Sequence, residues 1–306
     1  MKQLAVLGLV FALIGLAPFV IASEFWLNLV IMTLYAALLG QAWNILGGYG
    51  GQFSFGHAAY FGTGAYTVAV LSETLPYWAV LLVAAGIGLA VALVVGLATL
   101  RLAGVYFVIF TFGLAELIRQ LVTWYEVNVT GTLGRYIFLP ISPEQIYWQL
   151  LALAAVTIAI GWFIARSRLG LALKVIGDDE TVAAHTGINI AGVKLALFAV
   201  SATIITLVGA IQAPRWTYVE PSIVFNPTIS FLTLIMALLG GANRLWGPAL
   251  GAIPLFLLFE WLSANFPSHY SIILGLMFIA IVFVVPRGVL AGIEDLLKGV
   301  RKGKAV

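Results

Sequence analysis

The sequence predicts an all-α polytopic membrane protein, built as a single transmembrane domain over residues 1–306. Of its residues, 62% are hydrophobic and only 9% are charged, and the mean hydropathy is +1.09. A soluble domain carries about 25% charged and about 45–50% apolar residues, so this chain has too few polar residues to cover a water-soluble fold. Disorder is excluded because such chains are poor in apolar residues. The apolar runs do not alternate as barrel strands would, so they are predicted to be helices.

Ten runs come close to the length of about 20 apolar residues that a membrane-spanning helix needs. The eighth run is short and the tenth is marginal, so either could be re-entrant, and we expect eight to ten crossings. The predicted spans are 4–22, 25–46, 53–71, 76–100, 102–122, 146–165, 193–213, 228–242, 247–265 and 270–286.

The distribution of Lys and Arg predicts the orientation. If all ten runs cross, three of the 15 basic residues, Arg119, Arg135 and Arg215, fall on one side, which leaves twelve on the other. Cytoplasmic loops carry the excess of positive charge, so both termini are predicted to be cytoplasmic. The first run has an alternative interpretation as a cleaved secretory signal, because Lys2 precedes it and small residues end it before Ser23.

Two loops are longer than the others. Residues 123–145 are predicted to be an irregular extracytoplasmic loop, and residues 166–192 a cytoplasmic one. The short basic C-terminal tail is expected to lie at lipid headgroups. The net charge of +3 comes from scattered basic residues, which form no patch for nucleic acid.

The motifs of an enzyme are missing from the sequence. There are no cysteines, and the three histidines, His57, His185 and His269, do not have metal-ligand spacing. Neither a GxSxG elbow nor a GxxxxGK[ST] phosphate loop occurs. We therefore expect a protein that is not itself an enzyme and that binds no metal or cofactor.

A glycine-rich run over residues 44–66 interrupts the apolar sequence. Irregular backbone at membrane depth is tolerated only where it is buried or lines a cavity. One interpretation is a translocation path, and the other is close packing of helices through small residues. The path candidates are Asn44, Gln52, Ser54, Gly56 and His57. A second glycine-rich break covers 239–252, where Gly247 and Gly251 form a GxxxG pattern typical of helix packing.

Two acidic residues, Glu116 and Glu260, fall within predicted spans, where a carboxylate is costly and a functional role is the default hypothesis. Glu116 is therefore added to the path candidates. Arg119 and Gln120 lie on the same helical face, so a structural ion pair is the alternative. No chain of acids or histidines continues a proton relay.

The cytoplasmic loop contains a predicted short helix. Gly177 is expected to end the preceding run, Asp178 to act as N-cap, and Gly187 to terminate the helix as a C′ glycine. An attached motor could push against such a helix; the alternative is an ordinary solvated loop helix.

Three blocks of this sequence resemble the LivM-type permease subunits of branched-chain amino acid ABC importers. They are the run from Asn44 to Tyr66, the run from Ser167 to Asn189 followed by Lys194 and Ser201-Ala202, and Gly240-Gly241 followed by Gly247-Pro248 and Gly251-Ala252. Together they cover most of residues 35–255 in the family's order. The sequence departs from the family at Gly177, at His185 and at Asn243–Leu245.

The resemblance implies a permease in the inner membrane of a prokaryote. It would pair with a homologous permease, two cytoplasmic ATPases that bind ATP and Mg²⁺, and an extracytoplasmic binding protein. The implied ATPase-coupling residues are Gly170, Asp178, Asp179, Glu180, Ala183, Ala184 and Gly187. Branched-chain amino acids are the expected substrates. Urea or short amides, carried by related permeases, and an ion-coupled secondary transporter are the alternatives.

Overall fold

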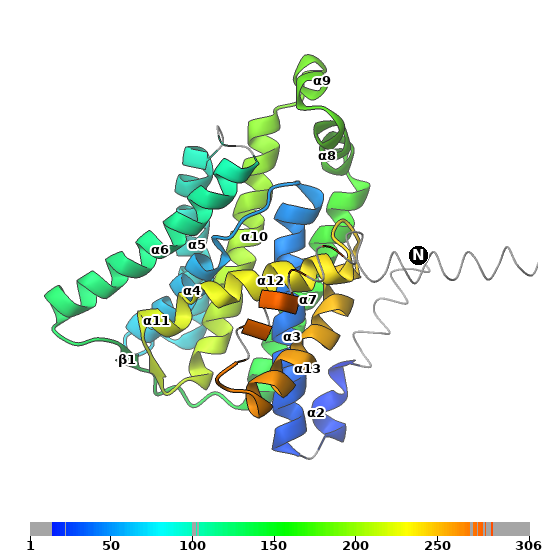
Figure 1. Ribbon diagram of the computed structural model, residues 1–306. Helices are drawn as coiled ribbons and strands as arrows, with labels where there is room; N and C mark the ends of the chain where they lie inside the picture. Colours follow the sequence, from blue (N-terminus) through cyan, green and yellow to red (C-terminus); the bar gives the residue numbers. More distant parts are fainter. Residues whose placement is uncertain are drawn as a thin grey trace, which may run out of the picture.

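The computed structural model confirms an all-α polytopic membrane protein (Figure 1). The structure describes residues 14–21, 23–99, 102 and 104–269, together with 272–273, 275–277, 279 and 283. Seven helical segments in this part of the chain are long and apolar enough to cross a membrane. Both termini and most of the predicted spans 4–22 and 270–286 lie outside the described residues, and so do the predicted cleavage site and basic tail.

The elements follow one another in a simple order. The α-helices are α2 (Ala17–Val20), α3 (Glu24–Trp43), α4 (His57–Leu71), α5 (Tyr77–Thr99), α6 (Val105–Tyr125), α7 (Pro143–Arg166), α8 (Arg168–Asp178), α9 (Glu180–His185), α10 (Ile190–Gln212), α11 (Pro221–Val224), α12 (Pro227–Gly240) and α13 (Gly247–Asn265). The π-helices η1 (Asn44–Tyr49) and η2 (Glu126–Thr130) extend α3 and α6, and the 3-10 turn η3 (Ala213–Arg215) extends α10. Two short strands, β1 (Arg135–Tyr136) and β2 (Tyr218–Val219), pair antiparallel.

Two predicted boundaries are wrong. Helix α4 begins at His57 and not at residue 53, because residues 50–56 leave the helix; its 15 residues span about 22 Å, less than a hydrocarbon core of about 30 Å. The predicted loop 123–145 is helical as far as Thr130, since α6 continues into η2. The irregular part starts at Gly131, which has a φ of +74°.

Helix α10 forms the centre of the bundle and packs against α4 and α5 (Figure 1). Glycines bring the backbones of α10 and α4 together. A Cβ atom at Gly64 would lie 1.8 Å from the carbonyl oxygen of Thr206, and one at Gly209 would lie 2.1 Å from that of Phe61. Membrane helices associate through such small residues, because lipid is as apolar as the helices themselves.

A second close contact joins α12 to α13 through the GxxxG glycines. A Cβ atom at Gly251 would lie 2.3 Å from the backbone nitrogen of Gly240, and one at Gly240 would lie 1.7 Å from the carbonyl oxygen of Gly247. The interpretation of this pattern as a packing motif is therefore confirmed.

The two ends of the bundle differ (Figure 1). Helices α8 and α9 project at one end, while α2, α11 and β1 lie at the opposite end. We name them the inner and outer ends, following the predicted orientation. At the outer end the buried carboxylate of Glu126 accepts hydrogen bonds from the backbone nitrogen of Gly134 at 2.6 Å and from Arg135 Nε at 3.0 Å.

Candidate functional site

Asn44 connects the two glycine-rich segments. Its amide nitrogen donates to the carbonyl oxygen of Arg244 at 3.1 Å, and its amide oxygen accepts from the backbone nitrogen of Asn243 at 3.0 Å. One turn earlier, Gln41 Nε2 donates to the carbonyl oxygen of Leu245 at 2.6 Å. Residue 48 is glycine because a Cβ atom there would lie 1.8 Å from the amide oxygen of Asn44. The two breaks therefore lie against each other at the inner end.

The loop from η1 to α4 is fastened by a second set of hydrogen bonds. The carbonyl oxygen of Ser54 accepts from Trp43 Nε1 at 3.1 Å, and its hydroxyl accepts from the backbone nitrogen of Gly56 at 3.1 Å. The backbone nitrogen of Phe55 donates to Thr111 Oγ1 at 3.1 Å. Both polar groups of Ser54, which is 1% exposed, are thus bonded within the loop and its neighbouring helices.

Gln52 and His57 are placed differently from Asn44 and Ser54. Gln52 is half-buried and lines a cavity of about 420 Å³ at the inner end, shared with the start of α6, the end of α8 and Lys194. His57 is 2% exposed, and its Nδ1 atom has no hydrogen-bond partner within the described part of the chain. Of the predicted path residues described so far, Gln52 lines a cavity, and the bonds of Asn44 and Ser54 support the packing interpretation.

Glu116 is not brought to the other path candidates. On α6, it forms an ion pair with Arg119, and Gln120 Nε2 donates to it at 3.0 Å. Glu116 and its two partners lie on one face of the same helix, as their spacing predicts. The predicted ion pair is therefore present, and a role for Glu116 in transport stays a prediction.

Replacing Asn44 with alanine is expected to destabilise the protein by about 1–3 kcal/mol, because two hydrogen bonds of a buried amide are lost together. The measurement is the thermal unfolding midpoint of the purified protein in detergent. The matched control is Asn128→Ala, which removes an exposed amide bonded to its own helix. Equal midpoints for the two variants would contradict the role given to Asn44.

Two hydroxyl groups that were not predicted as site residues bind the backbone of α3 and α4, the helices on either side of the irregular segment. Ser230 Oγ accepts from the backbone nitrogen of Ala58 at 2.8 Å, and Ser201 Oγ donates to the carbonyl oxygen of Ala42 at 2.6 Å. A hydroxyl on an apolar helix is a usable signal, because buried polar groups need partners. The signal does not identify the partner, which comes from another part of the chain.

The cytoplasmic helix has a different cap from the one predicted. Asp179 is the N-cap of α9, and its carboxylate accepts from the backbone nitrogens of Thr181 at 2.6 Å and Val182 at 3.2 Å. The prediction of Asp178 as N-cap is wrong because α8 continues through Gly177 and ends at Asp178. The prediction for Gly187 is confirmed: its φ is +80°, its N–H bonds to Ala184, and the next N–H bonds to Ala183.

Helix α9 is tied to the start of α10. Glu180 forms an ion pair with Lys194, whose side chain is 12% exposed. Ala183 is fully buried within the chain, so the expectation that it faces a partner is wrong. Val182, Ala184 and His185 are exposed. Gly170 has a structural role, because a Cβ atom there would lie 2.3 Å from the carbonyl oxygen of Ile164.

The cap of α9 is expected to be insensitive to pH in the physiological range. Hydrogen bonds from the Val182 and Thr181 backbones hold the pKa of Asp179 below its ordinary value. A lowered pKa means that the carboxylate contributes stability above its unfolded pKa of about 3.9 and loses it only as the pH falls through the lower folded value. Hydrogen exchange of the Thr181 and Val182 amides, corrected for intrinsic rates, should therefore be constant down to about pH 5. Loss of protection between neutral pH and this value would contradict the assignment.

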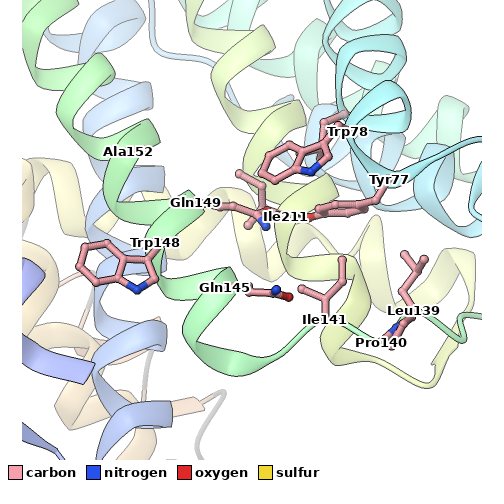
Figure 2. Close-up of a pocket in the computed structure, with 11 residues that line it drawn as sticks. Tyr77, Trp78, Leu139, Pro140, Ile141, Gln145, Trp148, Gln149, Ala152 and Ile211 are labelled. Carbon is pink, nitrogen blue, oxygen red and sulfur yellow. Dashed lines mark hydrogen bonds between the residues drawn. The ribbon is translucent and has the colours of Figure 1, made fainter. Parts of the chain in front are cut away.

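An aromatic cavity of about 640 Å³ opens at the outer end between α5 and α7 (Figure 2). Figure 2 shows Trp78 and Trp148 on either side of it, and Tyr77 Oη donates to Gln149 Oε1 at 2.7 Å across it. Tryptophan and tyrosine concentrate where membrane meets water. Residues of both types line this cavity.

Comparison with known proteins decides the family. The family model described as "Branched-chain amino acid transport system / permease component" matches residues 25–282. The chain belongs to this permease family. It is 26% identical to the high-affinity branched-chain amino acid transport system permease protein LivM of Escherichia coli, over 94% of this chain and 75% of that protein.

Other relatives of this permease match over shorter regions. The permease protein LivH of Escherichia coli is 26% identical over 48% of this chain and 47% of its own length. The ribose import permease protein RbsC of Haemophilus influenzae is 25% identical over 39% of each chain. No solved structure gives a significant match. The chain is therefore a multi-pass membrane permease of the ABC transporter family.

Proposed function

We propose that this permease is one of two homologous membrane subunits of an ATP-driven importer for branched-chain and similar hydrophobic amino acids. Each subunit would form half of the translocation path in the cytoplasmic membrane of a bacterium. Two cytoplasmic ATPases would bind at the inner end, and an extracytoplasmic binding protein would deliver substrate to the outer end. The names of LivM and LivH, both similar to this chain, support a pairing of two related permeases.

The observation that carries this proposal is the construction of α9. The helix projects from the inner end (Figure 1), it is capped at both ends, and the ion pair from Glu180 to Lys194 holds it against α10. Its exposed residues leave a surface for a partner. A motor transmits force best through an element that resists deformation, and the caps and the ion pair support this role for α9.

The connection from α9 leads into the centre of the molecule. Lys194 lies on the first turn and a half of α10, and the same helix packs its glycines and small residues against α4. Movement of α9 would therefore displace a helix that most of the bundle contacts. This arrangement suits a subunit driven from its cytoplasmic face.

Reconstitution tests this function. The chain should co-purify with a second permease and with ATPase subunits, and the complex in proteoliposomes should import leucine only with ATP inside and binding protein outside. Uptake by this chain alone on an ion gradient would favour the secondary transporter and refute the proposal. ATP-dependent uptake of urea, short amides or ribose in place of leucine would refute the substrate assignment and leave the ATP-driven permease standing.

A further inference from the structure

A cavity of about 300 Å³ lies at the outer end between α3, the end of α10, the start of α12 and α13. This volume is at the lower limit of the range of about 300–1,000 Å³ that small-molecule sites occupy. Most of its wall is apolar or aromatic, including Tyr35, Leu39, Phe61, Trp216 and Phe256. Neither the path candidates nor the coupling residues line this cavity, so the proposed function assigns it no role so far.

Gln212 supplies a buried amide to this cavity. It is the last residue of α10 and is 2% exposed. Within the part of the chain that the structure describes, its amide nitrogen has one acceptor, the thioether sulfur of Met32 at 4.0 Å. A thioether is a weak acceptor, and buried amides ordinarily find stronger ones. The amide is therefore available to a ligand that carries an oxygen.

Glu260 supplies a carboxylate to the same cavity from α13. Among the described residues its side chain forms no ion pair and accepts no hydrogen bond. Glu260 is exposed in this chain, at a position within a predicted membrane span, and charged residues in such spans commonly mark substrate routes. The chemistry that would satisfy it is an ammonium group.

Arg215 is not itself a lining residue, but it lies directly before Trp216 and three residues after Gln212, both of which line the cavity. Its Nη2 atom donates to Asn28 Oδ1 at 3.2 Å, and its Nη1 atom is buried with no partner among the described residues. Asn28 lies one helical turn before Met32, which lines the cavity, so the two are on one face of α3. A guanidinium in this place can bind a carboxylate.

We propose that this cavity binds a zwitterionic α-amino acid with an apolar side chain, as the outer site that receives substrate. Glu260 would bind the ammonium group, Arg215 with Gln212 the carboxylate, and the aromatic wall the side chain. The proposal rests on the proposed function and adds to it the place where substrate binds. Urea and short amides lack both charges, and a sugar lacks the charges and the apolar group, so none of them fits this site.

The test measures equilibrium binding of radiolabelled leucine to the complete complex in lipid nanodiscs, without ATP or binding protein. Leucine should bind and be displaced by isoleucine and valine, but not by urea, acetamide or ribose. Two analogues test the charges by competition on the unmodified complex. N-acetyl-leucine lacks the ammonium group, and leucinamide lacks the carboxylate. Each should compete at least tenfold more weakly than leucine, and this result depends on no substitution.

The variants then assign the two charges. Glu260→Gln and Arg215→Gln should each weaken leucine binding at least tenfold, while Glu260→Asp, which keeps the charge, should weaken it less. The matched control is Glu73→Gln, which neutralises an exposed carboxylate at the outer end and should leave binding unchanged. The thermal unfolding midpoint of each variant separates loss of the ligand from loss of the fold.

The outcomes distinguish this site from the function on which it rests. Unchanged leucine binding in Glu260→Gln and Arg215→Gln, or equal competition by N-acetyl-leucine, would overturn the site. If the same complex still imports leucine with ATP and binding protein, the proposed function stands. Displacement of leucine by urea or ribose would overturn the site's assignment to zwitterions.

Discussion

Replacing Ala184 with glutamate is expected to detach the ATPase subunits and abolish uptake, while the two permease chains remain paired. Ala184 is exposed on α9, the helix that we propose docks on the ATPase. An unpaired charge forced into a desolvated interface costs several kcal/mol, and each 1.4 kcal/mol is about a tenfold loss of affinity. The measurement is the amount of ATPase that co-purifies with the permease, together with ATP-driven uptake in proteoliposomes.

The control for Ala184→Glu introduces the same residue at the opposite end of the molecule. Thr132 is exposed in the outer turn, so Thr132→Glu should leave ATPase attachment unchanged. Neither Arg135 nor Ala183 is suitable for this experiment, because Arg135 pairs with a buried carboxylate and Ala183 is fully buried. Normal uptake by Ala184→Glu with both ATPases bound would refute the assignment of α9.

Two alanine substitutions at membrane glycines should have effects of opposite sign. Gly64→Ala would place a Cβ atom 1.8 Å from the carbonyl oxygen of Thr206. The helices α4 and α10 must then separate, which removes packing contacts along the centre of the bundle. At Gly86 in α5, by contrast, an added Cβ atom would meet no other atom within 4 Å. Alanine there gains helix propensity of about 1 kcal/mol and should stabilise the protein slightly.

Thermal unfolding of the two purified variants in the same detergent provides the measurement. We expect Gly64→Ala to lower the midpoint strongly and to reduce the yield of monodisperse protein, since overpacking costs about 1–3 kcal/mol or more. The comparison controls for glycine loss itself, because both positions are helical. A Gly64→Ala midpoint equal to that of Gly86→Ala would contradict the close approach of α4 to α10.

Long apolar helices were predictable because each carries its own signal. The predicted span 76–100 and the observed α5 agree within one residue at each end, and α7 and α13 lie close to their predicted ranges. Gly187 was equally predictable, since a positive φ at a helix end favours glycine over all other residues. In these cases the deciding interaction lies within a few residues of the signal.

Features that depend on distant residues could not be predicted. The burial of Ala183 depends on how α9 lies against the rest of the chain, and α9 alone shows only a short alanine-containing helix. The partners of Asn44 come from residues near 244, and no local pattern connects the two breaks.

The bonds of Asn44 also impose an order on how the protein is made. Its partners lie 199 and 200 residues further along the chain, so they leave the ribosome about 10–40 s later at about 5–20 residues per second. During that time α3 must enter the membrane with a polar amide near its inner end and no native acceptor. The inner end of this permease is therefore among the last parts of the molecule to be completed during synthesis, and a chain released before residue 243 cannot complete it.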